Sequence, residues 1–94
     1  MIKHLVLWNL KSDTPLRDVD EITFQLLQLK KLDEVLELSV LKSNLKSSSR
    51  SYCLNVVFLN EKDYQSYLEH PDHIKVSNLI NQAFCDRVCF DVEY

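Results

Sequence analysis

The sequence predicts an α+β fold in which helices cover one face of a four-stranded antiparallel sheet. Three observations predict it. Apolar residues recur at every second position in some segments and at every third to fourth position in others. These segments follow the order strand, helix, strand, strand, helix, helix, strand, which is typical of α+β sandwiches. The chain has 94 residues, 46% of them apolar, so we expect a single domain over residues 1–94.

The first expected elements are a strand over residues 2–10 and a helix over residues 15–31. Alternate residues of the strand, including His4, share one largely apolar face, and the other face is largely apolar too. Thr14 followed by Pro15 predicts the helix start, with the threonine hydroxyl as cap and proline at the first helical position. Apolar residues at helical spacing predict its buried stripe: Val19, Ile22, Leu26 and Leu29.

Two strands joined by a hairpin are expected next. Alternating apolar residues from Leu36 predict a strand that ends at Leu41. The polar stretch at residues 43–49, rich in serine, predicts a mobile hairpin loop, with a phosphorylation or anion site as the alternative. The third strand is expected over residues 51–59, and both of its faces are mostly apolar. One of these faces carries Tyr52, Leu54, Val56 and Phe58.

The last third of the chain predicts a helix pair and a final strand. Asn60 is a favourable helix cap, and Asp63 lies three residues further on. Pro71 is expected to end this helix and to open a second one over residues 72–84. One row of the second helix contains His73, Ser77, Ile80 and Phe84. Apolar and polar residues alternate over residues 88–94, which predicts a fourth strand with a more polar second face.

This order allows two split β-α-β units to interleave in the ferredoxin-like manner. Helices then cover only one face of the sheet, whereas apolar residues occupy the other face as well. The residues expected on this open face are Leu5, Leu7, Val57 and Leu59, or their neighbours of opposite parity. Because large apolar patches exposed to water favour association, we expect a homodimer formed through the open face.

Composition excludes several classes of function. The net charge is −3 and no concentrated basic face is present, so we expect no nucleic-acid partner. The chain has no glycine, which excludes the glycine-dependent loops that bind nucleotides and the nucleophile elbows of hydrolases. No apolar run approaches the roughly 18 residues of a membrane helix, and Lys3 and Lys11 flank a strand-like segment rather than a cleavable signal. We therefore expect a cytoplasmic protein without a membrane partner.

Two motifs lie on the first strand and at the junction of the helix pair. Residues 1–8 read Met-Ile-Lys-His-Leu-Val-Leu-Trp, and residues 67–73 read Tyr-Leu-Glu-His-Pro-Asp-His. Together with the spacing from residues 56–58 to Tyr64, they resemble the stress-responsive A/B barrel family over nearly the whole chain. The resemblance implies a dimeric α+β barrel. Two four-stranded sheets pack together in such a barrel, and each protomer keeps a cavity between its sheet and its helices.

One branch of this family consists of plant polyketide cyclases, which close aromatic rings. The resemblance places their catalytic tyrosine and histidine at Tyr67 and His73. It also places a pocket histidine at His4, and it places Tyr52 where these cyclases carry a second pocket histidine. A histidine at position 73 can act as a general base, while Tyr67 can hold a carbonyl or phenolate oxygen. The apolar walls of such a pocket would be Trp8, Leu26, Ile80 and Phe84.

The same residues also have purely structural interpretations. His4 can be a core histidine satisfied by a neighbour, and Tyr64 and Tyr67 can be large core residues whose hydroxyls reach solvent. His70, before Pro71, can end a helix by bonding a carbonyl. The cysteines are odd in number, lack C-x-x-C spacing and are expected to be buried free thiols: Cys53, Cys85 and Cys89.

No metal site and no cofactor are predicted. His70, Asp72 and His73 are clustered in the sequence, and Asp91 and Glu93 lie on the last strand. The His-x-x-His spacing across a proline does not match the two-histidine helical spacing of zinc hydrolases, and no third ligand is fixed by the sequence.

Three functions follow from these observations. The first is a small homodimeric barrel that binds a small, partly apolar organic molecule between sheet and helices. The second is an enzyme with cyclase-like or lyase-like acid–base chemistry on an enolisable carbonyl compound, with His73 as base and Tyr67 orienting the oxygen. The third is a non-catalytic assembly module whose cavity is filled by its own side chains.

Overall fold

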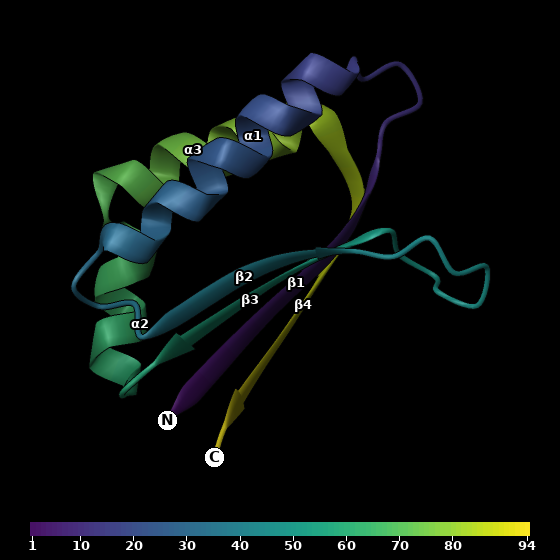
Figure 1. The fold of residues 1–94 in the computed structure, drawn as a ribbon. Coiled ribbons are helices and arrows are strands. Elements are labelled where there is room, and N and C mark those ends of the chain that lie inside the picture. Colours follow the sequence, from purple (N-terminus) through teal and green to yellow (C-terminus); the bar gives the residue numbers. More distant parts are fainter.

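The computed structural model describes residues 1–94 and shows a four-stranded antiparallel sheet with all helices on one face (Figure 1). The elements are β1 (Ile2–Leu10), α1 (Leu16–Gln28), a 3₁₀ turn η1 (Leu29–Lys31), β2 (Glu37–Lys42), β3 (Tyr52–Phe58), α2 (Glu61–Glu69), α3 (Pro71–Ala83) and β4 (Phe84–Glu93). The strand order is β2-β3-β1-β4, so β3 and β1 are central. The predicted ferredoxin-like α+β class is confirmed. None of the helices has the length and apolar character needed to cross a membrane.

Helix α1 begins one residue later than predicted, and Thr14 does not cap it. Pro15 occupies the N-cap position, and no side chain caps the first turn. The Thr14 hydroxyl instead donates a hydrogen bond to the carbonyl of Ala83 at 3.1 Å, which ties the start of α1 to the end of α3. The predicted last turn of this helix is η1. The predicted stripe is buried: Val19, Ile22, Leu26 and Leu29.

The helix pair α2–α3 is joined at His70. Asn60 Oδ1 accepts a hydrogen bond from the backbone N–H of Asp63 at 2.9 Å, which confirms the predicted cap of α2. At the junction, the backbone N–H of His70 donates to the carbonyl of Tyr67. The ring Nδ1 of His70 accepts the backbone N–H of Asp72 at 3.1 Å. The imidazole therefore caps the following helix and does not bond a carbonyl of the preceding one.

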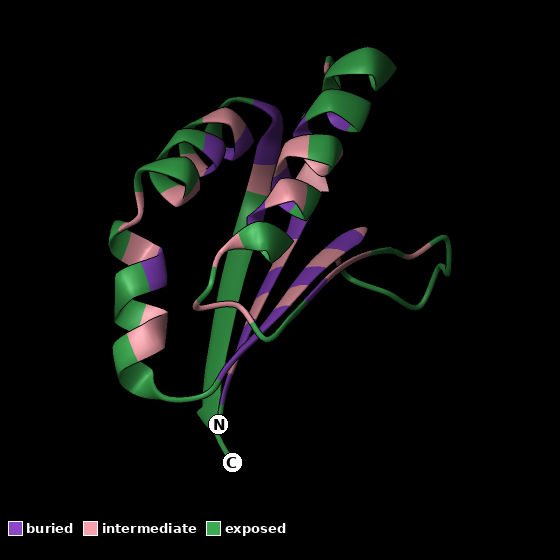
Figure 2. Cartoon of the chain, turned by 60° about the vertical axis from the view of Figure 1, so that its left-hand side comes forward, coloured by how far each residue is buried: buried purple, intermediate pink, exposed green.

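The central strands bury one face against the helices (Figure 2). On β1 the buried row is Ile2, His4, Val6 and Trp8, and on β3 it is Tyr52, Leu54, Val56 and Phe58. Strand β2 begins one residue later than predicted, because its ladder with β3 starts at the pair Glu37–Val57. Leu36 precedes the ladder and is 56% exposed, so Leu38 is the first inward residue of this strand.

Strand β4 differs most from the prediction. Phe84, expected at the end of the preceding helix, is its first residue. Its apolar row lies on the open face, in register with Leu5 and Leu7 of β1, and its polar row, which includes Asp91 opposite His4, faces the helices. The exposed apolar residues of this row are Val88, Phe90 and Val92. Alternation reveals two faces of a strand but does not identify the inward one, because neighbouring strands set the register.

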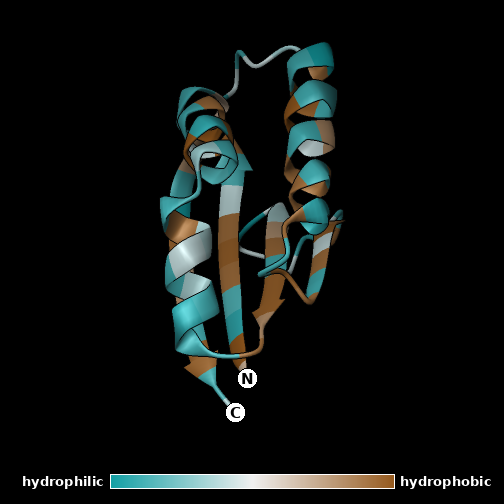
Figure 3. Cartoon of the chain, turned by 90° about the vertical axis from the view of Figure 1, so that its left-hand side faces the viewer, coloured by the Kyte–Doolittle hydropathy of each residue, from teal (hydrophilic) through white to brown (hydrophobic).

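The sheet keeps an apolar open face. Hydrophobic segments recur along the strands and alternate with hydrophilic ones around the helices (Figure 3). Leu5 and Leu7 are half-buried, and Val57 is buried on the same face. Leu59 is exposed and directly follows the last residue of β3, so it lies just outside the strand.

The three cysteines are free thiols. Cys53 and Cys85 are half-buried, and burial raises the pKa of the Cys53 thiol. Cys89 is exposed, which corrects the expectation that all three are buried. It belongs to β4, an edge strand, where a side chain on the helix side is only partly covered.

Candidate functional site

A small cavity lies between the sheet and the helices. Its volume is about 20 Å³, the space of about one water molecule. The sheet and all three helices contribute to its wall. The residues predicted from the sequence that line it are His4, Leu26, Tyr67, His73 and Ile80. Two further polar residues, Ser77 and Arg87, also line it.

Tyr67 and His73 lie side by side although they belong to different helices. Their ring centroids are 4.4 Å apart, with an angle of 47° between the ring planes. Residues six apart on one continuous helix do not share a face. The break at residue 70 between α2 and α3 therefore brings the two rings together, as the sequence interpretation requires.

His73 is held in one tautomer. Its Nδ1 lies 3.2 Å from the carbonyl oxygen of Leu68, and only a protonated Nδ1 can donate to a carbonyl. The neutral ring therefore has its lone pair on Nε2. Burial is the main cause that lowers the pKa of His73, and charge–charge interactions with His4, Arg87 and His70 act in the same direction. The hydrogen bond to the Leu68 carbonyl opposes this shift. The ring is thus neutral near pH 7 and suited to accept a proton at Nε2.

The hydroxyl of Tyr67 is a polar group of this site without a hydrogen-bond partner. The side chain is fully buried, and its hydroxyl oxygen has no hydrogen-bond partner in the protein. Burial raises the pKa of this hydroxyl, while the positive charge of Arg87 lowers it by a smaller amount. Tyr67 therefore remains a neutral hydrogen-bond donor at neutral pH.

His4 is bound to groups of β4 and α2. Its Nδ1 lies 2.5 Å from Oδ1 of Asp91, and the hydroxyl of Tyr64 donates to Oδ2 of the same carboxylate at 2.9 Å. The His4 and Tyr64 rings also contact, with centroids 5.1 Å apart. Because Nδ1 faces Asp91, Nε2 is the nitrogen of His4 that remains for the cavity. His4 is thus a core histidine whose Nδ1 has a hydrogen-bond partner, and it also lines the cavity.

Three residues predicted for the pocket lie elsewhere. Trp8, Tyr52 and Phe84 form an aromatic stack in the core and do not line the cavity. The Trp8 ring is 4.9 Å from Phe84 and 5.9 Å from Tyr52 between centroids. These residues face the helices as predicted, but they lie on β1, β3 and β4 beyond the end of the cavity. A face assignment does not give the position of a residue along the strand, which is why the prediction included them.

The sequence patterns did not predict that three further side chains belong to the site: Tyr64, Arg87 and Asp91. Asp91 belongs to the polar row of the fourth strand, which was not assigned to the helix side. Arg87 precedes the expected strand and reaches the cavity only through the register of β4 with β1. The signal available was Tyr64 itself, three residues before Tyr67 and so on the same side of α2.

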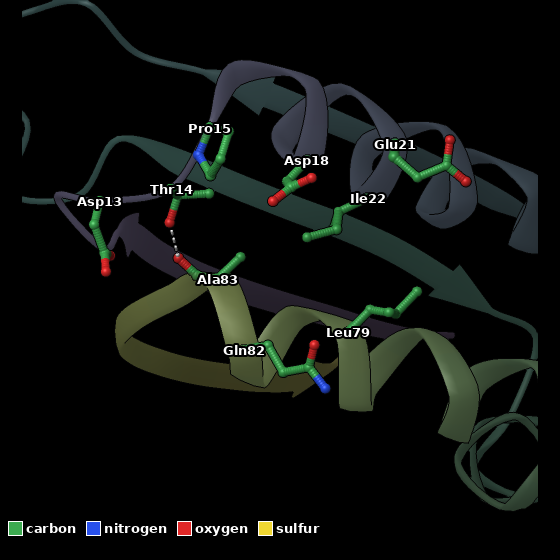
Figure 4. A pocket seen from close by; sticks show the side chains of 9 residues that line it. All are labelled: Asp13, Thr14, Pro15, Asp18, Glu21, Ile22, Leu79, Gln82 and Ala83. Carbon is green, nitrogen blue, oxygen red and sulfur yellow. Dashed lines mark hydrogen bonds between the residues drawn. The ribbon is translucent and has the colours of Figure 1, made fainter.

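A larger groove lies outside this site, between the start of α1 and the end of α3. Its volume is about 410 Å³. Asp18 and Glu21 on α1 stand across from Leu79 and Gln82 on α3 (Figure 4). With Asp13, all the charged side chains of the groove are carboxylates. None of the predicted site residues lies in this groove.

No group of three or more histidine, cysteine, aspartate or glutamate side chains has the arrangement that would hold a metal ion. His70 and Asp72 are neighbours, with Nδ1 and Oδ2 3.9 Å apart, but the ring nitrogen already caps α3. His73 uses its Nδ1 on the Leu68 carbonyl and does not join them.

The sequence and the fold can be compared with known families. The family model described as the Stress responsive A/B Barrel Domain matches residues 2–94. The chain belongs to the stress-responsive A/B barrel family. The resemblance drawn from the two sequence motifs is thereby confirmed for this A/B barrel protein.

Relatives of this A/B barrel extend the comparison. A stress-response A/B barrel domain-containing protein of Arabidopsis thaliana is 29% identical over 90 residues, which cover 94% of this chain and 34% of the plant protein. The chain thus spans about a third of the length of that relative.

Solved structures share the A/B barrel fold at low identity. A dimeric ferredoxin-like protein of unknown function from Thermobifida fusca superimposes with a TM-score of 0.89 at 19% identity, covering 99% of this chain and 90% of the other. Hydroxynitrile lyase from Passiflora edulis superimposes with a TM-score of 0.88 at 14% identity, covering 97% and 90%. The same fold therefore occurs in a dimeric protein and in an enzyme.

Proposed function

We propose that this A/B barrel protein binds a small, partly apolar organic molecule in the cavity between its sheet and its helices. The carrying observation is the Tyr67 hydroxyl, which is buried beside the cavity without a hydrogen-bond partner. An unpaired buried hydroxyl costs about 1–3 kcal/mol, so an oxygen atom of a bound molecule would relieve this cost. Apolar side chains such as Leu26, Val76 and Ile80 would contact the remainder of the molecule.

The cavity must widen before a molecule larger than water can enter. Its present volume of about 20 Å³ leaves no room for an organic ring. Arg87 is the only exposed residue among those that line it. Rotation of this one side chain toward solvent would open the entrance, so Arg87 marks the mouth. The apolar side chains inside would then have to move apart to admit the molecule.

An NMR titration tests this proposal. Small phenols, ketones and carboxylic acids are added to isotopically labelled protein, and saturable shifts are expected at the amides around Tyr67 and His73. Tyr67→Phe is expected to weaken binding by about tenfold, the effect of losing about 1.4 kcal/mol. Tyr94→Phe, which alters an exposed tyrosine, is the matched control. If no compound gives saturable shifts, the cavity is filled by its own side chains and the assembly module becomes the better interpretation.

Acid–base catalysis is the second candidate, and the geometry of His73 favours it. Nε2 of the neutral ring would remove a proton from the carbon next to a carbonyl group, and the electrons of the broken C–H bond would move onto the carbonyl oxygen. The Tyr67 hydroxyl would donate a hydrogen bond to that oxygen. Hydroxynitrile lyase from Passiflora edulis, an enzyme, has the same fold, and this likeness supports only the use of the fold in catalysis.

Deuterium exchange at an enolisable ketone tests the catalytic step without knowledge of the true substrate. In D₂O the wild type is expected to accelerate exchange at the carbon next to the carbonyl, and His73→Gln is expected to abolish the acceleration. Lys75→Gln, which alters an exposed side chain of the same helix outside the cavity, is the matched control. Equal exchange rates with wild type and His73→Gln would contradict catalysis and leave binding unaffected.

We also propose that two copies associate through the open face of the sheet. This face carries Leu41, Val88 and Phe90, which are between 45% and 59% exposed. Exposed apolar residues gathered on one face favour a protein partner. The Thermobifida fusca protein of the same fold is dimeric, which agrees with this proposal.

A further inference from the structure

Arg87 has no partner in the protein. None of the ion pairs of the structure involves it, although its side chain lines the cavity. No carboxylate lines the cavity. The carboxylate of Asp91, further along β4, is occupied by His4 and Tyr64. The mouth of the cavity therefore carries an unneutralised positive charge.

A β-bulge determines where this charge lies. In the ladder with β1, Leu7 pairs with Val88 and Asn9 pairs with Cys85, so two residues of β4 stand opposite one of β1. Asp86 is one of the two and has a φ of 55°, in the left-handed region that is costly for a residue with a Cβ atom. Bulges of this kind redirect side chains beside functional sites.

A regular strand would place Phe84 and Arg87 on opposite faces of the sheet. The bulge allows both residues to face the helices. Phe84 and Arg87 are three residues apart, and residues at that spacing alternate sides in a regular strand. Here Phe84 is buried in the aromatic stack and Arg87 lines the cavity. The side chain of Asn9 donates to Asp86 Oδ2 at 3.3 Å, and Arg50 Nε donates to the Asp86 carbonyl at 2.7 Å. Two hydrogen bonds thus hold the left-handed residue.

We propose that the cavity selects a small organic anion, whose carboxylate or equivalent charged oxygen pairs with Arg87 at the mouth. The inference rests on the proposed binding function and adds the class of ligand. A guanidinium group binds a carboxylate through two parallel hydrogen bonds, which fixes the orientation of the ligand. The apolar body of the anion extends inward along Val76 and Ile80, and a second oxygen accepts from Tyr67.

Benzoate and benzamide are suitable probes, because they have nearly the same shape and differ in charge. Each is titrated by NMR at one ionic strength into the wild type, Arg87→Gln and Arg17→Gln. Benzoate is expected to bind the wild type about tenfold more tightly than benzamide, a typical effect of one charge-assisted hydrogen-bond pair. Arg87→Gln is expected to remove this preference by weakening benzoate alone. Arg17→Gln removes the same charge from a side chain that is 90% exposed on α1 and should keep the preference.

The outcomes separate the two proposals. Equal affinities of benzoate and benzamide for the wild type would overturn the selection of anions and leave the binding function standing. Loss of the preference in Arg17→Gln to the same degree would also overturn it, since overall charge would then be the cause. If neither compound gives saturable shifts around Tyr67 and His73, the binding function fails and the selection fails with it.

Discussion

Tyr64 and Tyr67 stand one turn apart on α2, and both rings pack against Phe58, yet only the hydroxyl of Tyr64 is hydrogen-bonded. The ring centroids lie 5.1 Å and 4.9 Å from that of Phe58. The hydroxyl of Tyr64 donates to Asp91 at 2.9 Å, whereas that of Tyr67 has no partner. One tyrosine therefore joins the helix to the sheet, and the other keeps a free donor beside the cavity.

Removing the two hydroxyls is expected to have opposite effects on stability. Tyr64→Phe breaks the hydrogen bond to Asp91 and should lower the free energy of unfolding by about 1 kcal/mol. Tyr67→Phe removes a buried hydroxyl without a partner and should leave that free energy unchanged or raise it by about 1 kcal/mol. Urea unfolding of the two variants measures both. A Tyr67→Phe variant that is less stable than Tyr64→Phe would contradict the assignment of the free hydroxyl.

The free energy of unfolding is expected to depend on pH through His73. Burial lowers the pKa of His73 in the folded state from the ordinary 6.5, so the unfolded chain binds the proton more readily. The stability contributed by the neutral ring is complete above about pH 6.5 and is lost as the pH falls toward the lower pKa of the folded state.

Urea unfolding at about pH 5 and about pH 8 compares the wild type with His73→Gln, on either side of the imidazole range. The free energy of unfolding of the wild type should be lower at about pH 5 than at about pH 8, and this decrease should be smaller in His73→Gln. His70→Gln leaves His73 in place and should retain the decrease in the free energy of unfolding that is due to His73. An identical pH dependence in wild type and His73→Gln would show that His73 does not titrate differently on unfolding.

Asp86 supplies a test of the bulge in β4. Asp86→Gly and Asp86→Ala both remove the carboxylate that accepts from Asn9. Only glycine adopts a positive φ without a Cβ clash, so Asp86→Gly should exceed Asp86→Ala in unfolding free energy by about 1 kcal/mol. Thermal unfolding monitored by circular dichroism measures the difference. Equal midpoints would indicate that the left-handed conformation is not retained in solution.

The open face of the sheet is tested by a single charge. Phe90 is 58% exposed on this face, and Phe90→Lys should convert a dimer into a monomer because a lysine would have to be buried in the interface. Light scattering after size-exclusion chromatography gives the mass. Leu45→Lys, in the loop between β2 and β3, is the matched control, since Leu45 is 73% exposed and lies outside the sheet. A wild-type mass equal to that of one chain at all concentrations would contradict the dimer.

The sequence predicted the elements well where local patterns determine them. The alternation in β1 and β3, the stripe from Val19 to Leu29 and the cap at Asn60 all depend on residues close in the chain. The hydroxyl of Thr14 was misassigned because its acceptor, the Ala83 carbonyl, is distant in sequence and is brought near only by the packing of α1 on α3.

The candidate site was predictable only in part. The motif at residues 67–73 predicts that Tyr67 and His73 lie together, and their rings are in contact. His4 lines the same cavity. Arg87 was missed because its position depends on a bulge, and no glycine marks the left-handed residue at position 86. Trp8 and Tyr52 were included because face assignments do not give positions along a strand.

The aromatic stack has a spectroscopic consequence. Trp8 is the only tryptophan of the chain, has no exposed surface and lies against Phe84. Its fluorescence emission should therefore be at short wavelength in the folded protein and move to longer wavelength on unfolding. Because Trp8 does not line the cavity, a ligand at Tyr67 is not in contact with the indole. The chain thus contains its own optical reporter of folding, which can follow every variant above independently of binding.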